Sequence, residues 1–194
     1  PGGFSMGDEP DGSGKFIANV IRNPKITSAI EKMLNENDGL ILGICNGFQA
    51  LIKTGLLPYG EVRQIEATSP TLTYNNNARH IARIVQTRAV NTTSPWTREL
   101  SDSAIYKIPV SHGEGRFICS EESFAELNAN GQIAFLYEDN PNGSAYNIEG
   151  ILSPCGRILG KMAHSERIAD NLYKNMPDLI PQPIIKSGVN YFKK

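Results

Sequence analysis

The sequence predicts one α/β domain, in which helices cover a sheet with a parallel core. Three observations lead to this fold class: helical periodicity in residues 14–34, a short apolar strand in residues 40–44, and several strand-like segments after residue 80. Helix, buried strand, helix and then further strands is an order typical of an α/β sheet with antiparallel additions. At 194 residues the chain is long enough for one domain with a full hydrophobic core and short for two.

The N-terminal part of the chain is predicted to contain helices on either side of one buried strand. Apolar residues in 16–30 recur mostly with helical spacing, and Pro24 divides this segment into two short helices. Polar residues and a glycine in 35–39 end the second helix. Residues 40–44 are continuously apolar, as expected of a strand buried on both faces of a parallel sheet. A further helix begins near Phe48 and ends near Gly55.

The C-terminal part is predicted to be mainly β-structure. Alternating apolar residues indicate strands in 80–90, 104–110 and 133–137. Residues 147–152 and 157–162 flank a turn of small residues and proline, so we expect them to form a hairpin. Residues 166–176 are predicted to be helical, and the prolines that follow indicate an irregular stretch before the end of the chain.

Composition and charge restrict the classes of partner. With 40% hydrophobic and 20% charged residues and a formal net charge of −1, the chain has no electrostatic footprint for nucleic acid or a membrane surface. No apolar run approaches the roughly 18 residues needed to cross a bilayer. The three cysteines, Cys45, Cys119 and Cys155, form neither a disulfide framework nor a metal-ligand pairing. We therefore expect a cytoplasmic protein without a metal site, whose partners must be inferred from its active site.

Cys45 is the strongest candidate for a catalytic residue. It lies in the segment Gly43-Ile44-Cys45-Asn46-Gly47, between the buried strand and the following helix. A nucleophile on such a tight turn needs small neighbours two residues away, and the helix N-terminus favours a thiolate. The amide of Asn46 would form half of an oxyanion hole. The alternative is that Cys45 is a small buried hydrophobic residue, as free cysteines often are.

His164 and Glu166 could supply the base and its orienting partner. In an extended chain residues i and i+2 project to the same side, so Glu166 could accept a hydrogen bond from one ring nitrogen of His164 while the other faces a thiol. With Cys45 this gives the nucleophile, base and orienter of covalent catalysis. The alternative is a surface histidine that caps a helix beginning near Glu166.

The other two histidines carry weaker signals. His112-Gly113-Glu114 resembles the start of a zinc deaminase signature, which ends in Pro-Cys-x-x-Cys. After Pro154-Cys155, however, Ile158 stands at the position of the last cysteine of that motif. The flanking glycines suit either a substrate-binding loop or a polar turn. His80 is interpreted as structural or solvated.

The segment 7–15 is rich in glycine and acidic residues. Because Phe16 follows Lys15, the Gly-Lys-Ser/Thr ending of a phosphate-binding loop is absent, and the acidic residues would repel phosphate. We interpret this segment as a solvated loop that leads into a helix.

Three ordered segments resemble the signature segments of class I glutamine amidotransferase domains: Pro1-Gly2-Gly3-Phe4-Ser5, Gly43-Ile44-Cys45-Asn46-Gly47-Phe48-Gln49 and His164-Ser165-Glu166-Arg167. Within that class the chain is similar to the glutaminase domains of the phosphoribosylformylglycinamidine synthase family. The segments that carry this narrower resemblance are Gly7-Asp8-Glu9-Pro10-Asp11-Gly12, His112-Gly113-Glu114-Gly115-Arg116 and Asn140-Pro141-Asn142-Gly143-Ser144.

The resemblance implies a fold and an activity. It implies a flavodoxin-like three-layer domain with a mostly parallel sheet, in which Cys45 attacks the side-chain amide of glutamine and releases ammonia. It implies that Gly3 and Phe4 supply an oxyanion donor and that Gln49, His112 and Gly113 line the glutamine pocket. No cofactor is expected in this domain, because a synthetase domain of the same enzyme would use the ammonia together with ATP and magnesium.

The resemblance also implies that something is missing. Domains of this family have further strands before the Pro-Gly-Gly turn, so we expect residues 1–194 to be a glutaminase domain without its N-terminal strands, from the C-terminal part of a longer chain. Two alternatives remain. One is another cysteine hydrolase on the same scaffold, such as a γ-glutamyl hydrolase or a DJ-1-like protein, although Asn46 counts against the latter. The other is a non-catalytic interaction domain.

Overall fold

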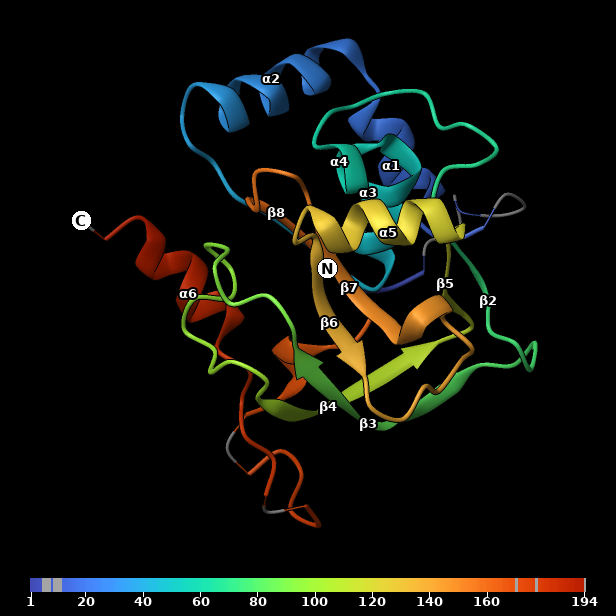
Figure 1. Cartoon of the computed structure of the whole chain (residues 1–194), viewed down its shortest axis with the longest axis vertical. Helices are drawn as coiled ribbons and strands as arrows, with labels where there is room; N and C mark the ends of the chain where they lie inside the picture. Colours follow the sequence, from blue (N-terminus) through green and yellow to red (C-terminus); the bar gives the residue numbers. More distant parts are fainter. Residues whose placement is uncertain (5–7, 9–11, 170, 177, 194) are drawn as a thin grey trace.

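The computed structural model describes residues 1–4, 8, 12–169, 171–176 and 178–193. Its strands form a six-stranded sheet in the order β1-β8-β7-β6-β3-β4 and a separate pair, β2-β5 (Figure 1). The strands are β1 (Ile41–Ile44), β2 (Thr71–Tyr74), β3 (Ile81–Ala89), β4 (Ile105–His112), β5 (Glu114–Ile118), β6 (Ile133–Tyr137), β7 (Ile148–Leu152) and β8 (Ile158–Lys161). The helices are α1 (Lys15–Ile21), α2 (Pro24–Asn35), α3 (Asn46–Thr54), α4 (Leu56–Tyr59), α5 (Glu121–Ala129) and α6 (Ile184–Tyr191), with short 3-10 helices η2 (Ala145–Asn147) and η3 (Ser165–Arg167).

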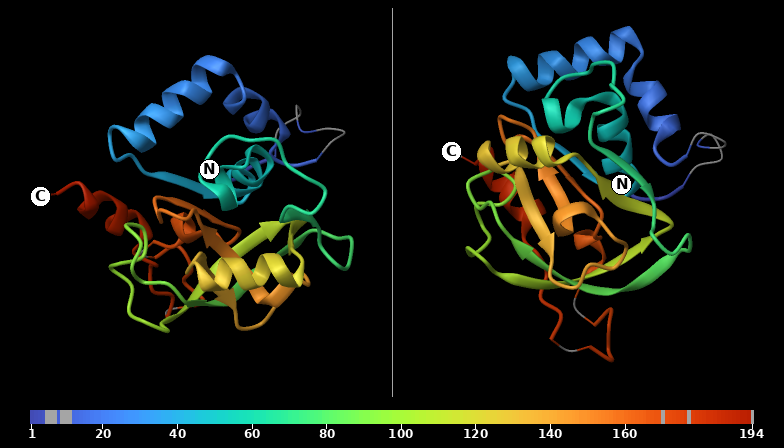
Figure 2. Two further views of the ribbon diagram at one scale, coloured as in Figure 1. Left: turned by 45° about the horizontal axis from the view of Figure 1, so that its top comes forward. Right: turned by 45° about the vertical axis from the view of Figure 1, so that its right-hand side comes forward.

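The six-stranded sheet is covered on both faces. The helices α1 to α4 gather on one side of it (Figure 2), and Phe48 of α3 and Leu127 of α5 pack on that face with Ile151 and Ile158. On the opposite face Trp96 packs with Ile184 of α6 and with strand residues such as Phe135. Successive residues of one strand point to opposite faces, so each buried strand contributes to both layers. The α/β class and the three layers are therefore as the sequence predicts.

The expectation of a mostly parallel sheet is wrong for the described strands. Only β1 and β8 pair in parallel, whereas β8–β7, β7–β6, β6–β3 and β3–β4 are antiparallel. Neighbouring strands joined by short turns must run antiparallel, because a parallel neighbour needs a long crossover. The link from β7 to β8 is a turn of this kind, as the predicted hairpin requires. Among the described strands β1 lies at one edge of the sheet, and the expectation of further strands before Pro1 stays a prediction.

The predictions for the N-terminal part of the chain are confirmed. α1 and α2 are the two short helices, β1 is the strand predicted for 40–44, and α3 is the helix that follows it. The helix predicted for 166–176 is wrong. The chain forms only the short η3 there, followed by turns in the described residues, and Asn171 adopts a positive φ of 62°. Ile168 is extended and buried against Val85 and Ile108. Tertiary packing of this side chain thus replaces helical continuation.

Among the α-helices and strands, five were not predicted: β2, β5, α4, α5 and α6. A sequence signal for α5 exists, because Ser120 caps it by accepting from the Ser123 N–H and Glu121 and Glu122 occupy its first turn. No helix in the described part of the chain is long and apolar enough to cross a membrane.

Candidate active site

Cys45 lies on a strained turn between β1 and α3. Its φ is 53° and its ψ is −108°, a conformation that non-glycine residues rarely adopt. Its backbone N–H donates to the Lys161 carbonyl of β8 at 2.8 Å, which fixes the turn to the sheet. A Cβ on Gly43 would lie 2.8 Å from the backbone carbonyl carbon of Gly47, which cannot move aside easily, so glycine is required there, whereas a Cβ on Gly47 would meet nothing closer than 3.4 Å. Of the two glycines that the turn was expected to need, only Gly43 is demanded by packing.

His164 is held beyond the end of β8, next to Glu166. Its ring is fully buried, and the distance from Nδ1 to Glu166 Oε1 is 2.6 Å. The pair forms as expected, but not in the expected way. His164 has φ −90° and ψ 79°, and the following residues form η3 instead of continuing an extended strand. The backbone N–H of His164 donates to the Pro109 carbonyl of β4, which turns the chain here. His164 Nε2 has no hydrogen-bond partner among the described residues.

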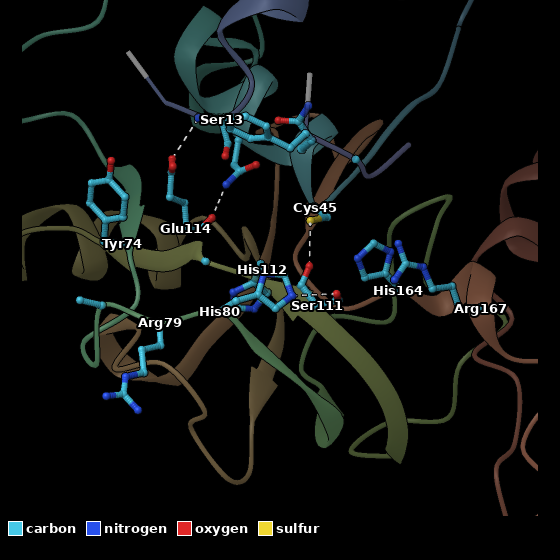
Figure 3. A pocket seen from close by; sticks show the side chains of 16 residues that line it. Ser13, Cys45, Tyr74, Arg79, His80, Ser111, His112, Glu114, His164 and Arg167 are labelled. Carbon is cyan, nitrogen blue, oxygen red and sulfur yellow. Dashed lines mark hydrogen bonds between the residues drawn. The ribbon is translucent and has the colours of Figure 1, made fainter. Parts of the chain in front are cut away.

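The N-terminal segment brings the two groups together. A Cβ on Gly2 would lie 2.6 Å from His164 Cε1 and 3.2 Å from Cys45 Cβ. Gly2 thus occupies the space that borders both the Cys45 side chain and the His164 ring, where an added Cβ would force one of them or the N-terminal segment to move. Figure 3 shows Cys45 and His164 on neighbouring walls of one cavity, with Cys45 Sγ 3.9 Å from the Ser111 carbonyl oxygen.

Two backbone N–H groups face the thiol. Burial raises the pKa of Cys45, while the Asn46 N–H, the Arg167 charge and the Gly3 N–H oppose this, and the net pKa is above its ordinary value. The helix N-terminus acts in the expected direction, because the Asn46 N–H lowers the pKa of Cys45, but burial outweighs it and the resting site does not favour the thiolate. A base must remove the proton when the sulfur attacks. The same two N–H groups are placed as the donors of an oxyanion hole would be.

Glu166 is suited to remain ionised beside His164. Burial alone would raise the pKa of its carboxyl, but the hydrogen bond with His164, its own backbone N–H and the charges of His164 and Arg167 hold that pKa below its usual value. An ionised carboxylate at Nδ1 leaves Nε2 as the nitrogen that can accept a proton.

The cavity beside Cys45 has a volume of about 540 Å³. All the residues that the resemblance assigned to substrate binding line it, as does His164 (Figure 3). The lining residues are Gly3, Phe4, Ser13, Cys45, Asn46, Gln49, Tyr74, Ala78, Arg79, His80, Ser111, His112, Gly113, Glu114, His164 and Arg167. Their roles in binding stay predictions, whereas their common location is a property of the structure.

One wall of the cavity was not foreseen from the sequence. It is formed by Tyr74 and by the loop that joins β2 to β3, including His80, whose Nε2 lies 3.0 Å from Ser111 Oγ. His80 therefore has a place in the site that the interpretation as a structural or solvated residue missed. Buried Asn75 organises this loop: its Nδ2 donates to the carbonyls of Arg79 and His112, each at 2.8 Å. The hydrogen bond between Asn75 and His112, which are 37 residues apart, is the contact that would have identified this loop as a wall of the cavity.

Asn75 also determines which nitrogen of His112 carries the proton. Because Asn75 Nδ2 donates both its hydrogens, Asn75 Oδ1 must accept, and His112 Nδ1 at 3.1 Å is the donor. Burial, followed by the charges of His80 and His164, lowers the pKa of His112 to about 4. His112 is therefore neutral at pH 7 and lines the cavity, and its buried Nε2 is an acceptor without a hydrogen-bond partner among the described residues.

Asp8, in the predicted solvated loop of residues 7–15, is more buried than predicted. Asp8 is fully buried, and it accepts from the Phe16 N–H at 2.9 Å and from Asn46 Nδ2 at 3.4 Å. Residues 5–7 and 9–11 of the predicted solvated loop lie outside the described residues.

Gln49 Nε2 donates to the Glu114 carbonyl, which joins α3 to the start of β5. No group of three or more potential metal ligands occurs among the residues that the structure describes.

Comparison with known proteins gives the family. A family model described as a CobB/CobQ-like glutamine amidotransferase domain matches residues 1–193. The chain belongs to this family. Among solved structures, this amidotransferase domain is similar to "PurLQS from Thermotoga maritima", with 30% identity, a TM-score of 0.76, and coverage of 98% of this chain and 77% of that chain.

A more distant likeness supports the fold alone. The structure "Trypanosoma brucei CTPS - glutaminase domain with bound acivicin" matches with 15% identity and a TM-score of 0.53, covering 89% of this chain and 78% of that chain. The fold class and the glutamine amidotransferase assignment made from the sequence are thereby confirmed.

Proposed function

We propose that this chain is the glutaminase domain of a phosphoribosylformylglycinamidine synthase, with Cys45 as nucleophile. The observation that carries the proposal is the convergence of Cys45 and the His164–Glu166 pair on Gly2, with the Asn46 and Gly3 N–H groups at the sulfur. The narrower assignment rests on the motifs that resemble that synthase family and on the likeness to the Thermotoga structure.

In the first half-reaction Cys45 Sγ attacks the side-chain carbonyl carbon of glutamine. His164 Nε2 takes the thiol proton, so that no free thiolate is needed beforehand, and the carbonyl oxygen becomes an oxyanion held by the two N–H groups. The tetrahedral intermediate then collapses. The carbon–nitrogen bond breaks, the leaving nitrogen takes the proton from His164, and ammonia departs, leaving a glutamyl thioester on Cys45.

In the second half-reaction water attacks the thioester. His164 accepts a proton from that water, the carbon–sulfur bond breaks, and the proton returns to Cys45 as glutamate leaves. Glu166 keeps the ring in the required tautomer throughout. The neutral acceptor His112 Nε2 is suited to an N–H group of the substrate, such as the α-ammonium group.

The ammonia would serve a synthetase domain, on the same polypeptide or in a partner subunit, which uses ATP and magnesium to convert formylglycinamide ribonucleotide to the amidine. Such a synthase works in the cytoplasm. The residues described here hold neither nucleotide nor metal in this scheme, so both would belong to the synthetase domain.

The test uses the assembled synthase with either glutamine or ammonium as the nitrogen donor. Cys45→Ala should abolish synthesis of the amidine from glutamine and leave synthesis from ammonium intact, because only the glutaminase step needs the thiol. Equal loss of both activities, or glutamine-dependent synthesis without Cys45, would refute the proposal.

A further inference from the structure

A pair of fully buried charges lies directly behind the active site. Lys161 ends β8 and Glu149 lies in β7; both side chains are 0% exposed, and Nζ is 3.2 Å from Oε1. Two charges taken out of water cost several kcal/mol each, which their attraction offsets only with good geometry and further hydrogen bonds. Apolar side chains would fill this space in the sheet at lower cost. The partners of the pair therefore indicate what it does.

Those partners are the two residues on either side of His164. Lys161 Nζ donates to the Ala163 carbonyl at 2.8 Å and to Ser165 Oγ at 2.9 Å. Glu149 Oε1 accepts from the Ala163 N–H at 2.7 Å. Both backbone groups of Ala163 and the side chain of Ser165 are thus bound by the same ion pair.

The restraint extends beyond the pair. Ser165 Oγ donates to Gln182 Oε1 at 2.6 Å, and the His164 N–H donates to the Pro109 carbonyl at 2.8 Å. The segment 163–165 lies beyond the end of β8 and is tied to the sheet by the His164–Pro109 backbone hydrogen bond to β4 and by the side chains of Lys161 and Glu149. Its position relative to Cys45, which follows β1, depends on these contacts together.

We propose that the Lys161–Glu149 pair is a positioning element of the glutaminase site, which holds His164 in reach of the Cys45 thiol. The inference rests on the proposed function. The charged and titratable groups around the site are coupled to one another. His164 acts on His112 and Glu166, Arg167 and Glu166 act on Cys45, and Glu149 acts on Lys161 and on the buried Tyr137. The Glu166 charge also acts on Lys161, which links the pair to the carboxylate partner of His164.

The experiment replaces the pair by apolar side chains of similar volume, Lys161→Met with Glu149→Leu, in the intact protein. Inactivation by diazo-oxonorleucine, an electrophilic glutamine analogue, gives a maximal rate and a half-saturating concentration. A shift of His164 by about 1 Å costs up to about a hundredfold in rate, so we expect the maximal rate to fall at least tenfold or so while half-saturation changes less than about twofold. The single variant Glu149→Gln keeps an acceptor for the Ala163 N–H and should therefore retain most of the wild-type maximal rate.

The matched control is the exposed pair Arg88–Glu138, whose Nε–Oε1 distance is 2.6 Å and whose side chains are 39% and 37% exposed. Arg88→Met with Glu138→Leu should react at the wild-type rate. A folded Lys161→Met/Glu149→Leu variant that also does so overturns the inference.

Should that variant fail to fold, Ser165→Ala carries the test. It removes the hydroxyl between Lys161 and Gln182 at little cost in volume, and a folded variant should show a slower maximal rate. A rate equal to that of the wild type would overturn the inference. If the wild-type protein itself is not labelled at Cys45, the proposed function fails instead.

Discussion

Gly2→Ala tests the geometry of the site most sharply, because the residue borders both reacting side chains. The added Cβ would lie 2.6 Å from His164 Cε1 and 3.2 Å from Cys45 Cβ. Carbon atoms in contact are normally about 3.5–4.0 Å apart, so the ring must retreat by about 1 Å. If the N-terminal segment moves instead, the Gly3 N–H leaves the sulfur. Either movement separates a catalytic group, the His164 ring or the Gly3 N–H, from the Cys45 sulfur.

The size of the effect follows from this displacement. A misplacement of about 1 Å costs roughly a hundredfold in rate, which corresponds to about 2.7 kcal/mol in the activation barrier. Overpacking would destabilise the fold by only about 1–3 kcal/mol. The variant should therefore remain folded while losing most of its reactivity.

The assay is the rate of inactivation by diazo-oxonorleucine, with thermal unfolding as a check of folding. Gly47→Ala is the control, since its Cβ would approach nothing closer than 3.4 Å and its nearest neighbour is Pro1, the residue before Gly2. A folded Gly2→Ala protein that reacts within about threefold of the wild type would refute the geometry, because the expected loss is about a hundredfold.

Three further predictions concern the protonation and support of the site. Iodoacetamide at neutral pH should label Cys155 before Cys45. Cys155 is exposed, and its hydrogen bonds and the charge of Arg157 outweigh burial and lower its pKa, whereas burial raises the pKa of Cys45. The rate of Cys45 labelling should still be rising at pH 9, and mass spectrometry separates the two adducts. Glu166→Gln should slow inactivation by diazo-oxonorleucine by about a hundredfold or more through loss of ring orientation. The pKa of Glu166 is lower in the folded than in the unfolded protein, so its contribution to stability is present above the ordinary carboxyl pKa and is lost as pH falls through the lowered value. The free energy of unfolding of the wild type should therefore decrease at acidic pH by an amount that the Glu166→Gln variant does not show. Asn75→Ala should lower the free energy of unfolding by about 1–3 kcal/mol, because the buried His112 carbonyl and the partly buried Arg79 carbonyl lose this donor, and it should raise the half-saturating concentration of the analogue.

The sequence was sufficient where local pattern and tertiary structure agree. Residues 41–44 are apolar on both faces, and Gly43 has no side chain because the backbone of Gly47 approaches it closely, so the strand and the turn at Cys45 follow from the sequence. The pairing of His164 with Glu166 was also found from spacing, although the local conformation that achieves it is a tight turn and not an extended chain.

The sequence was insufficient where long-range contacts decide. The wall formed by the loop after β2 depends on Asn75, whose partners lie in Arg79 and in His112 on another strand. The direction of the Cys45 pKa shift depends on burial, which no local pattern reveals. The buried Lys161–Glu149 pair likewise joins two strands whose register had to be known before its contacts with Ala163 could be seen.

The central claim is that Cys45 is the nucleophile that attacks glutamine. The most direct measurement is to treat the intact protein with diazo-oxonorleucine, digest it and locate the adduct by mass spectrometry, with and without excess glutamine. We expect a single adduct on Cys45 that glutamine suppresses. An adduct on Cys119 or Cys155 with Cys45 unmodified would contradict the account.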